Sequence, residues 1–179
     1  MPVAPPDLAD RARGVRWLVL DVDGVLTDGT LQYGPEGEVI KGFHVRDGLG
    51  VRLAREAGLG LALITGRRSA IIERRARELG IEEVAMGANE KLATLARLAS
   101  RRGFELHQVA AIGDDLPDLP VLRRSGIAYA PIDAVAEVRD AAHVVLHSRG
   151  GRGAVREMIE HLLRQRGEWS GLVARLFGA

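Results

Sequence analysis

Residues 18–29 read LVLDVDGVLTDG, an apolar run that ends abruptly in carboxylates and glycines. Side chains alternate between the two faces of a β-strand, so Asp21 and Asp23 project to one side and Val22 to the other. Two carboxylates this close repel each other unless a cation lies between them or one of them binds a proton. The stretch therefore indicates a buried strand that ends in a metal site, an acid/base pair, or both. A strand end followed by a plain Asx/Gly turn is the simpler alternative.

The composition narrows the class of protein. The chain has 179 residues, 46% of them apolar and 27% charged, which fits one globular domain. The formal net charge of +1 gives no electrostatic reason to expect nucleic-acid or membrane binding. The absence of cysteine excludes disulfides, thiolate zinc sites and a cysteine nucleophile. No apolar run approaches bilayer length and residues 1–13 contain no apolar signal core, so we expect a cytoplasmic protein.

Short apolar runs alternate with segments of helical periodicity along most of the chain. The predicted strands are Val15–Leu20, Leu59–Ile64, Glu83–Met86, Val109–Ile112, Ile127–Tyr129 and His143–Leu146. The predicted helices are Gly48–Ala57, Ser69–Leu79, Glu90–Arg101, Leu116–Arg124, Ala134–Arg139 and Ala154–Arg164. This alternation is typical of parallel βαβ units with right-handed crossovers, and hence of an α/β fold.

Two segments break this alternation. Thr30–Val45 contains two short strand patterns around a Gly-Pro-Glu-Gly turn, which predicts a β-hairpin directly after the acidic stretch, placed as a flap over the strand end. Gly167–Ala179 is rich in apolar residues and is interpreted either as a disordered end or as a segment that docks on a neighbouring chain. With no repeat or linker present, residues 1–179 are expected to form one domain.

Polar residues follow four of the predicted elements at the edge where parallel sheets bind ligands. Besides Asp21 and Asp23, they are Thr65 in a Thr-Gly-Arg turn, Asp114 in the stretch GDDLPD, and Lys91 at a helix start. Carboxylates from two strand ends suit Mg²⁺, which prefers a few carboxylates together with water and phosphate oxygens. A hydroxyl and an ammonium group would contact the same phosphoryl group. Each motif alone could be a capped turn or a surface lysine; together they predict a phosphoryl-transfer site.

In these motifs the sequence resembles the haloacid dehalogenase superfamily, whose four motifs match DVDGVLTDG, LITGR, Lys91 and GDD. More narrowly, it resembles the 3-deoxy-D-manno-octulosonate 8-phosphate phosphatase family through KGFHVRDGLGVR (41–52), GDDLPDLPVLRRSG (113–126) and GGRGAVRE (150–157). The resemblance runs from about Val15 to Leu163, and only the ANEKL surroundings of Lys91 differ slightly from the family pattern. It implies a three-layer Rossmann-like fold of the haloacid dehalogenase type, with a hairpin flap and no large cap domain.

The resemblance also implies roles for individual residues. Asp21 would be the nucleophile and Asp23 the general acid/base, with Thr65 and Lys91 on the phosphate and Mg²⁺ held by Asp21, Asp114 and the Asp23 carbonyl. The family's substrate-contacting positions carry over onto Asp23, His44, Val45, Arg46, Asp47, Gly48, Arg52, Arg67, Arg75 and Lys91. The implied activity is hydrolysis of the eight-carbon sugar acid phosphate by way of an aspartyl-phosphate, in the lipopolysaccharide pathway. A homotetramer in which neighbours complete the site is implied as well.

Arg75 has support that does not depend on the resemblance. At about 100° per residue, Ile71, Ile72, Ala76 and Leu79 form an apolar arc of the helix, and Arg75 falls within it. An arginine there is costly unless its guanidinium reaches water or an anion. The alternatives are thus an aliphatic stem that carries its charge to solvent and a contact with an anionic substrate.

Three other functions are alternatives to this one. A phosphatase for a sialic-acid-type nine-carbon sugar 9-phosphate would have the same motifs, because both substrates are 2-keto-3-deoxy acids with a terminal phosphate. A signalling receiver domain also combines acids, Thr, Lys and Mg²⁺, but its phospho-accepting Asp follows the third strand, where this chain has Gly87-Ala88-Asn89. A catalytically silent subunit has no support, since every charged group that the chemistry needs is present.

Overall fold

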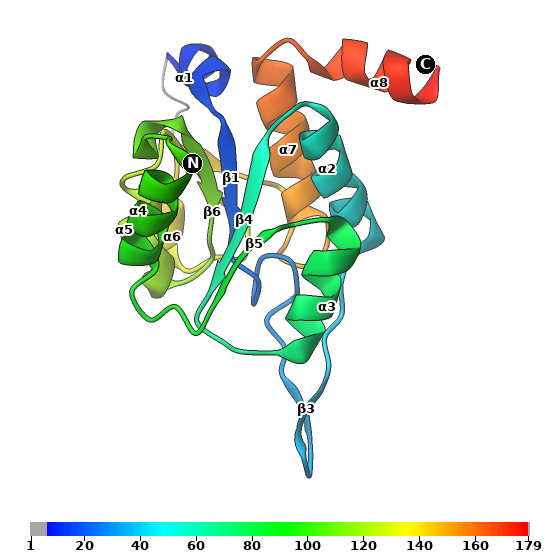
Figure 1. Cartoon of the computed structure of the whole chain (residues 1–179), viewed down its shortest axis with the longest axis vertical. Helices are drawn as coiled ribbons and strands as arrows, with labels where there is room; N and C mark the ends of the chain where they lie inside the picture. The colour runs from blue at the N-terminus through cyan, green and yellow to red at the C-terminus, as the bar shows by residue number, and fades with distance from the viewer. Residues whose placement is uncertain (1–6, 179) are drawn as a thin grey trace.

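The computed structural model describes residues 7–178 as a parallel sheet between two layers of helices (Figure 1). The sheet has six strands in the order β5-β4-β1-β6-β7-β8, all pairs being parallel. Their bounds are β1 (Trp17–Leu20), β4 (Gly60–Thr65), β5 (Glu83–Met86), β6 (Val109–Ile112), β7 (Ile127–Ala130) and β8 (Val144–Val145). The predicted α/β class is confirmed, and each predicted strand is present, with ends that differ from the prediction by at most two residues.

The two helical layers bury opposite faces of the sheet. One layer contains α1 (Leu8–Gly14), α2 (Val45–Glu56), α3 (Ala70–Leu79), α7 (Ala154–Gln165) and α8 (Trp169–Phe177). The other contains α4 (Lys91–Arg102), α5 (Leu119–Leu122) and α6 (Ala136–Ala141). In β1, Leu18 and Leu20 belong to the first core and Val19 to the second, as the alternation of a strand buried on both faces requires.

Helix α2 begins at Val45, three residues before the predicted start at Gly48. Its N-cap is His44, whose ring nitrogen accepts the backbone N–H of Arg46 at 3.3 Å. Position 44 is histidine and not the usual Ser, Thr, Asp or Asn, so the sequence lacks a clear N-cap signal for this start. Gly48 and Gly50 lie inside the helix despite their low helical propensity. The structure explains them by close packing: a Cβ on Gly50 would lie 3.0 Å from the Cα of Arg156 in α7.

One other helical prediction needs correction. Leu116–Arg124 is a 3₁₀ turn, η2 (Leu116–Asp118), followed by the short α5, because Pro117 and Pro120 lack the N–H groups of a longer helix. The helices α1 and α8 and the 3₁₀ turn η1 (Leu106–Gln108) were not predicted. Within the described part of the chain, no helix combines the length and the apolar character that a membrane crossing needs.

The predicted hairpin consists of β2 (Gln32–Gly34) and β3 (Gly37–Ile40), which pair antiparallel and project beyond the sheet (Figure 1). The segment is shorter than predicted, since Val45 already belongs to α2. Tyr33, Val39 and Ile40 are exposed on it. At the other end of the chain, α8 buries Leu172 against the core of its own chain. Docking of the C-terminal segment on a neighbour therefore stays a prediction, and Ala179 lies outside the described residues.

The glycines of the GGRG run hold the loop that follows β1. The N–H of Gly151 donates to the carbonyl of Val25 at 2.8 Å. A Cβ on Gly150 would lie 1.8 Å from the carbonyl oxygen of Gly24. The run thus serves close backbone packing against residues 24–28, which directly follow Asp21 and Asp23.

We predict that Gly150→Ala lowers the free energy of unfolding by about 1–3 kcal/mol, because the added methyl group meets backbone that cannot move independently. Urea denaturation measures this. Gly171→Ala in α8 is the matched control: its Cβ would meet nothing within 4 Å, so alanine should be neutral or stabilising by up to about 1 kcal/mol. Equal midpoints and slopes for the two variants would contradict the packing role.

Candidate active site

The predicted catalytic residues meet at the carboxyl edge of four adjacent strands. Asp21 directly follows β1, and its N–H donates to the carbonyl of Ile112 in β6 at 3.2 Å. Thr65 is the buried last residue of β4, and Asp114 comes two residues after β6. Lys91 is the first residue of α4, after β5. Neighbouring parallel strands therefore bring together groups that lie up to 93 residues apart in the sequence.

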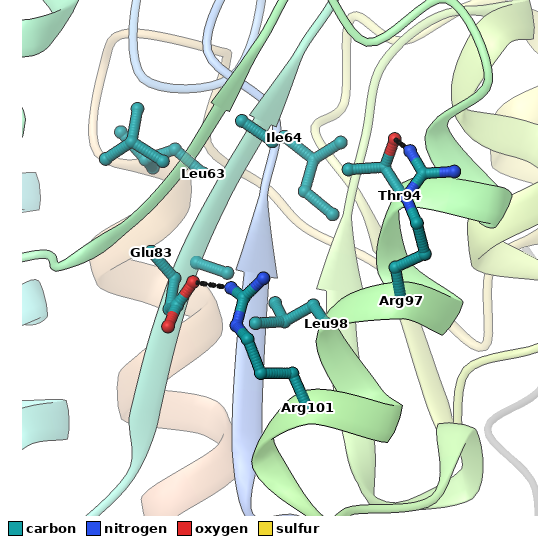
Figure 2. Close-up of a pocket in the computed structure, with 10 residues that line it drawn as sticks. Leu63, Ile64, Glu83, Thr94, Arg97, Leu98 and Arg101 are labelled. Carbon is teal, nitrogen blue, oxygen red and sulfur yellow. Dashed lines mark hydrogen bonds and ion pairs between the residues drawn. The ribbon is translucent and has the colours of Figure 1, made fainter.

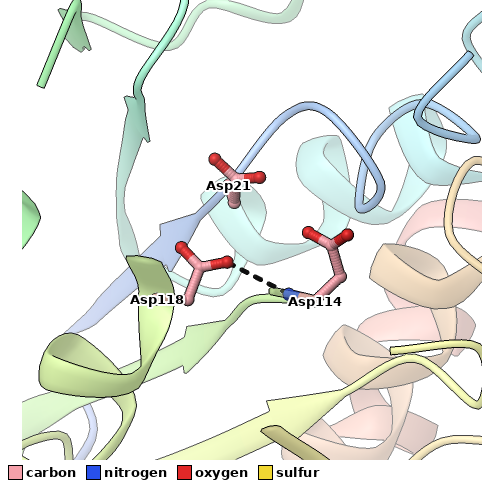
Figure 3. A group of neighbouring side chains, drawn as sticks. All are labelled: Asp21, Asp114 and Asp118. Atoms are coloured by element: carbon pink, nitrogen blue, oxygen red, sulfur yellow. Dashed lines mark hydrogen bonds between the residues drawn. The ribbon is translucent and has the colours of Figure 1, made fainter. Parts of the chain in front are cut away.

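Three carboxylates form the centre of this site (Figure 3). Asp21, Asp114 and Asp118 each offer an oxygen atom, and these atoms all lie within 4.8 Å of one another. Asp118 is fixed by the backbone, since its Oδ2 accepts the N–H of Asp114 at 3.1 Å. The cluster offers only hard oxygen ligands, which is the donor set that Mg²⁺ prefers.

Lys91 binds two of these carboxylates. Its Nζ lies 2.7 Å from Asp21 Oδ1 and 2.6 Å from Asp118 Oδ1, and all three side chains are buried. Burial alone would lower the pKa of Lys91, but the two carboxylates outweigh it and raise that pKa. The ammonium group therefore stays charged at neutral pH and fixes the orientation of Asp21.

One ammonium group does not neutralise three carboxylates. Burial, followed by the charge of Asp118, raises the pKa of Asp21 well above its ordinary range. Burial, followed by the charges of Asp21 and Asp118, raises the pKa of Asp114 to about 8. A divalent cation among these oxygens would remove the repulsion that a proton otherwise relieves. The residues thus fit a Mg²⁺ ion.

Asp23 lies in a second set of charged residues beside the first. Its Oδ1 accepts a hydrogen bond from Lys41, which also forms an ion pair of 2.9 Å with Glu38 Oε1. Arg67, from the loop after β4, has its Nε 4.0 Å from Asp23 Oδ2. Arg67 also donates to the hydroxyl of Tyr33 in the hairpin. The hairpin is therefore joined to the loop that carries Arg67.

The remaining predicted substrate contacts are distributed unevenly. Asp47 is buried, and its oxygens accept N–H groups of Gly153 at 3.2 Å and Arg156 at 2.8 Å, so its side chain faces the start of α7. Arg46 lines a cavity of about 340 Å³ formed mostly by α7. Val45 and Arg52 are exposed on α2. Within these contacts the structure joins neither Asp47 nor Arg46 to the catalytic carboxylates.

For Arg75 the structure shows the first of the two alternatives, a stem that carries its charge to solvent past neighbouring side chains. Its guanidinium lies 5.5 Å from the ring centre of Phe43, and its Nη1 donates to Glu78 at 3.3 Å. A Cβ on Gly48 would lie 2.7 Å from its Nη2, so the guanidinium packs closely against the backbone of α2. The side chain is 23% exposed, so the charge reaches solvent over the aromatic ring.

A separate cavity of about 160 Å³ lies between β4, β5 and α4 (Figure 2). Leu63, Ile64 and Leu98 line it, and Arg101 binds Glu83 across its opening. None of the predicted catalytic residues lines this cavity. We therefore place the candidate active site at the carboxylate cluster instead.

Sequence reasoning did not select Asp118 and Lys41 as site residues. Asp118 could have been found from its spacing, because it lies four residues after Asp114 in GDDLPD. Lys41 had a signal in the composition: the chain has 23 arginines and only two lysines, Lys41 and Lys91. No local pattern connects Lys41 with Asp23, which lies 18 residues earlier.

Comparisons with known proteins agree with this geometry. A haloacid dehalogenase-like hydrolase family matches residues 83–159. The 3-deoxy-D-manno-octulosonate 8-phosphate phosphatase KdsC of Yersinia pestis is 43% identical over 162 residues, which cover 90% of this chain and 86% of the relative. This chain belongs to that phosphatase family. The family member of Haemophilus influenzae is 40% identical over 163 residues, covering 91% of each chain.

Solved structures of the phosphatase family have the same fold. The enzyme from Moraxella catarrhalis, in complex with a magnesium ion, a phosphate ion and a KDO molecule, matches with a TM-score of 0.91 at 38% identity, over 94% of this chain and 97% of that one. A cobalt-bound family member from Haemophilus influenzae matches with a TM-score of 0.87 at 41% identity, over 89% of this chain and 94% of that one. The expected family and its haloacid dehalogenase-type fold are confirmed.

The raised pKa values predict how Mg²⁺ stabilises the protein at different pH. Without metal, Asp114 keeps its proton in the folded protein up to about pH 8, whereas the unfolded chain loses it near the ordinary pKa of 3.8. The stability that this proton contributes is therefore full below about pH 3.8 and is lost as the pH rises through about 8. Below that pH a proton competes with the ion. The increase in melting temperature on adding Mg²⁺ should therefore be larger at about pH 8.5 than at about pH 5.5. Differential scanning fluorimetry measures it.

Asp114→Asn should abolish most of this Mg²⁺-dependent increase. Asp115→Asn is the matched control, because Asp115 is the exposed neighbour and asparagine can still cap η2. An increase that is independent of pH, or equal in the two variants, would contradict the metal assignment.

Proposed function

We propose that this protein is a phosphomonoesterase that hydrolyses 3-deoxy-D-manno-octulosonate 8-phosphate to the free sugar acid and inorganic phosphate, with Mg²⁺ as its cofactor. One observation carries the proposal: Asp21 and Asp114 converge with Lys91 at a single buried point, in a chain about 40% identical to phosphatases of that name. The corresponding place in metabolism is lipopolysaccharide biosynthesis in the cytoplasm.

The reaction proceeds in two steps, each of which uses both aspartates that follow β1. In the first, a carboxylate oxygen of Asp21 attacks phosphorus, the bond from phosphorus to the sugar oxygen breaks, and Asp23 gives that oxygen its proton. In the second, Asp23 takes a proton from water, whose oxygen attacks the aspartyl-phosphate. The Asp21 carboxylate and inorganic phosphate are released. Two displacements at phosphorus thus leave the enzyme unchanged.

The charges around Asp21 supply the stabilisation that phosphoryl transfer needs. Lys91 places one positive charge beside the nucleophile, and Thr65 offers a hydroxyl at the end of β4. Asp21, Asp114 and the carbonyl of Asp23 are proposed to hold Mg²⁺, with Asp118 orienting Lys91 and the loop after β6. When bound, the ion neutralises negative charge on the phosphoryl oxygens.

The sugar acid is proposed to bind through cations near the hairpin. Arg67 is the arginine beside the general acid/base, since its Nε is 4.0 Å from Asp23 Oδ2. Arg75 holds its guanidinium against Phe43, partly open to solvent. Either guanidinium can bind a sugar carboxylate in bidentate fashion. His44, Val45, Arg46, Gly48 and Arg52 at the start of α2 are proposed contacts as well, and Asp47 is proposed to act by holding α2 against α7.

Phosphate release from a panel of sugar phosphates, with and without Mg²⁺, tests the proposed function. The eight-carbon 8-phosphate should have the highest kcat/KM, and EDTA should abolish turnover. Asp21→Asn should remove activity on every substrate, and Asp23→Asn should slow both steps by roughly 100-fold or more. A higher kcat/KM for a nine-carbon sialic-acid-type 9-phosphate would overturn the proposed substrate but not the proposed two-step mechanism. Parent-like turnover by Asp21→Asn would remove the mechanism.

We also propose that the protein forms a homotetramer in which neighbouring chains complete the site. Its hairpin exposes the apolar side chains of Tyr33, Val39 and Ile40, and exposed apolar residues grouped on one element support a contact with another chain. Light scattering with size-exclusion chromatography should give a mass four times that of the 19.3 kDa chain. A fully active monomer would contradict this proposal.

A further inference from the structure

The chain uses lysine in a restricted way. Its 23 arginines are spread over the molecule, whereas its two lysines, Lys41 and Lys91, are both only 8% exposed and both touch the acidic motif. Each lysine lies between two acids. Lys91 contacts Asp21 and Asp118, and Lys41 contacts Asp23 and Glu38. Each aspartate that follows β1 therefore has an ammonium partner of its own.

The chemistry of the two cations explains why lysine stands at these positions. An ammonium group is compact and directs three donors in different directions, whereas a guanidinium is a wide planar fork. A buried gap between two carboxylates accommodates the former. The side chain of Lys41 is 1% exposed; its ammonium group donates to Asp23 and forms an ion pair with Glu38. Lys41 is thus placed to hold protein groups.

The two oxygens of Asp23 differ in their surroundings. Oδ1 is bound by Lys41. Oδ2 is buried and has no hydrogen-bond partner among the residues that the structure describes, and the same holds for the Nε of Arg67, 4.0 Å away. A buried oxygen without a partner is costly, so its place in the fold indicates a ligand atom. An atom that lies beside both groups, and not between them, can be within hydrogen-bond distance of Oδ2 and of the Nε of Arg67.

We propose that Lys41 is a positioning residue for the reaction: it holds Oδ1 of Asp23, so that Oδ2 is the oxygen that exchanges protons with the leaving group and with water. This inference rests on the proposed function, because it takes Asp23 to be the general acid/base. It adds the residue that orients the acid and the atom that carries the proton.

The hairpin keeps Lys41 in place. Lys41 directly follows β3, which carries Glu38. The carboxylate of Glu38 contacts Lys41 through Oε1 and accepts the hydroxyl of Ser69 through Oε2. Ser69 is the N-cap of α3. Lys41 is therefore held between Asp23 and the start of α3, and the position of the hairpin determines the orientation of Asp23.

Kinetics of Lys41→Met on two leaving groups test the proposal. Loss of the general acid should slow cleavage of a sugar phosphate, because its alkoxide leaving group needs a proton. It should leave cleavage of p-nitrophenyl phosphate nearly unchanged, because the phenolate leaves without a proton. We expect kcat/KM to fall by roughly 100-fold for the sugar phosphate and by less than about threefold for the aryl ester. The aryl ester should also give a burst of p-nitrophenol, since Asp23 is the base that hydrolyses the aspartyl-phosphate. Glu36→Gln, which alters an exposed charge at the hairpin turn, is the matched control and should behave like the parent.

Other outcomes overturn the proposal. If kcat/KM falls equally on both esters, Lys41 is a structural residue. If only KM rises, Lys41 is a substrate contact. If the kinetics equal those of the parent, Lys41 has no role in the reaction. If the parent cleaves the aryl ester but not the sugar phosphate, the proposed substrate fails, and the ratio is then measured with another alkyl phosphate that the enzyme accepts.

If Lys41→Met does not fold, the contact between Lys41 and Asp23 can be tested in a variant that keeps Lys41. Protein labelled with ¹⁵N-lysine has only two side-chain ammonium groups, so its spectrum contains two such resonances at most. Asp23→Asn should shift the resonance of Lys41 and leave that of Lys91 near its parent position. An unshifted Lys41 resonance would overturn the contact on which the proposal rests.

Discussion

Buried carboxylates repel one another at the carboxyl edge of the sheet, and the surrounding structure must compensate this repulsion. Asp21, Asp114 and Asp118 lie within a few ångströms of one another, where burial makes their negative charges costly. The fold supplies Lys91 as one compensating charge, and the remaining charge calls for a divalent cation. The same excess of negative charge that costs stability without metal gives the site its affinity for Mg²⁺ and so makes the phosphoryl chemistry possible.

The surrounding backbone is shaped to bring these groups together. Gly24 adopts a positive φ of 91°, and a Cβ there would lie 2.0 Å from Asp114 Oδ2, so only glycine lets the two loops approach. Gly150 also permits a close approach, because a Cβ there would meet the carbonyl oxygen of Gly24. The hairpin closes the arrangement from the solvent side through Lys41 and Glu38. Three segments far apart in the sequence therefore fix one loop of the acidic motif.

Several elements followed from the sequence because their signals are local. Buried strands such as Val109–Ile112 were predicted to the residue, since the shortness of the apolar run and the glycine that follows it favour a strand over a buried helix. The start of α2 was predicted three residues too late because its N-cap is His44, and no preferred N-cap residue marks Val45 as the first helical residue. Helix α8 was missed because its one buried side chain, Leu172, is covered by segments distant in the chain.

The sequence by itself determined the α/β class, the chemistry of the site and most of its charged groups, because acids, a threonine and a lysine at successive strand ends leave little else to predict. Only the tertiary structure decided which acid each cation holds. Asp118 and Lys41 act across separations of 27 and 18 residues from Lys91 and Asp23, and no periodicity encodes such contacts. Spacing along a strand fixes which face a side chain takes, whereas the choice of oxygen on Asp23 depends on how a hairpin folds back over it.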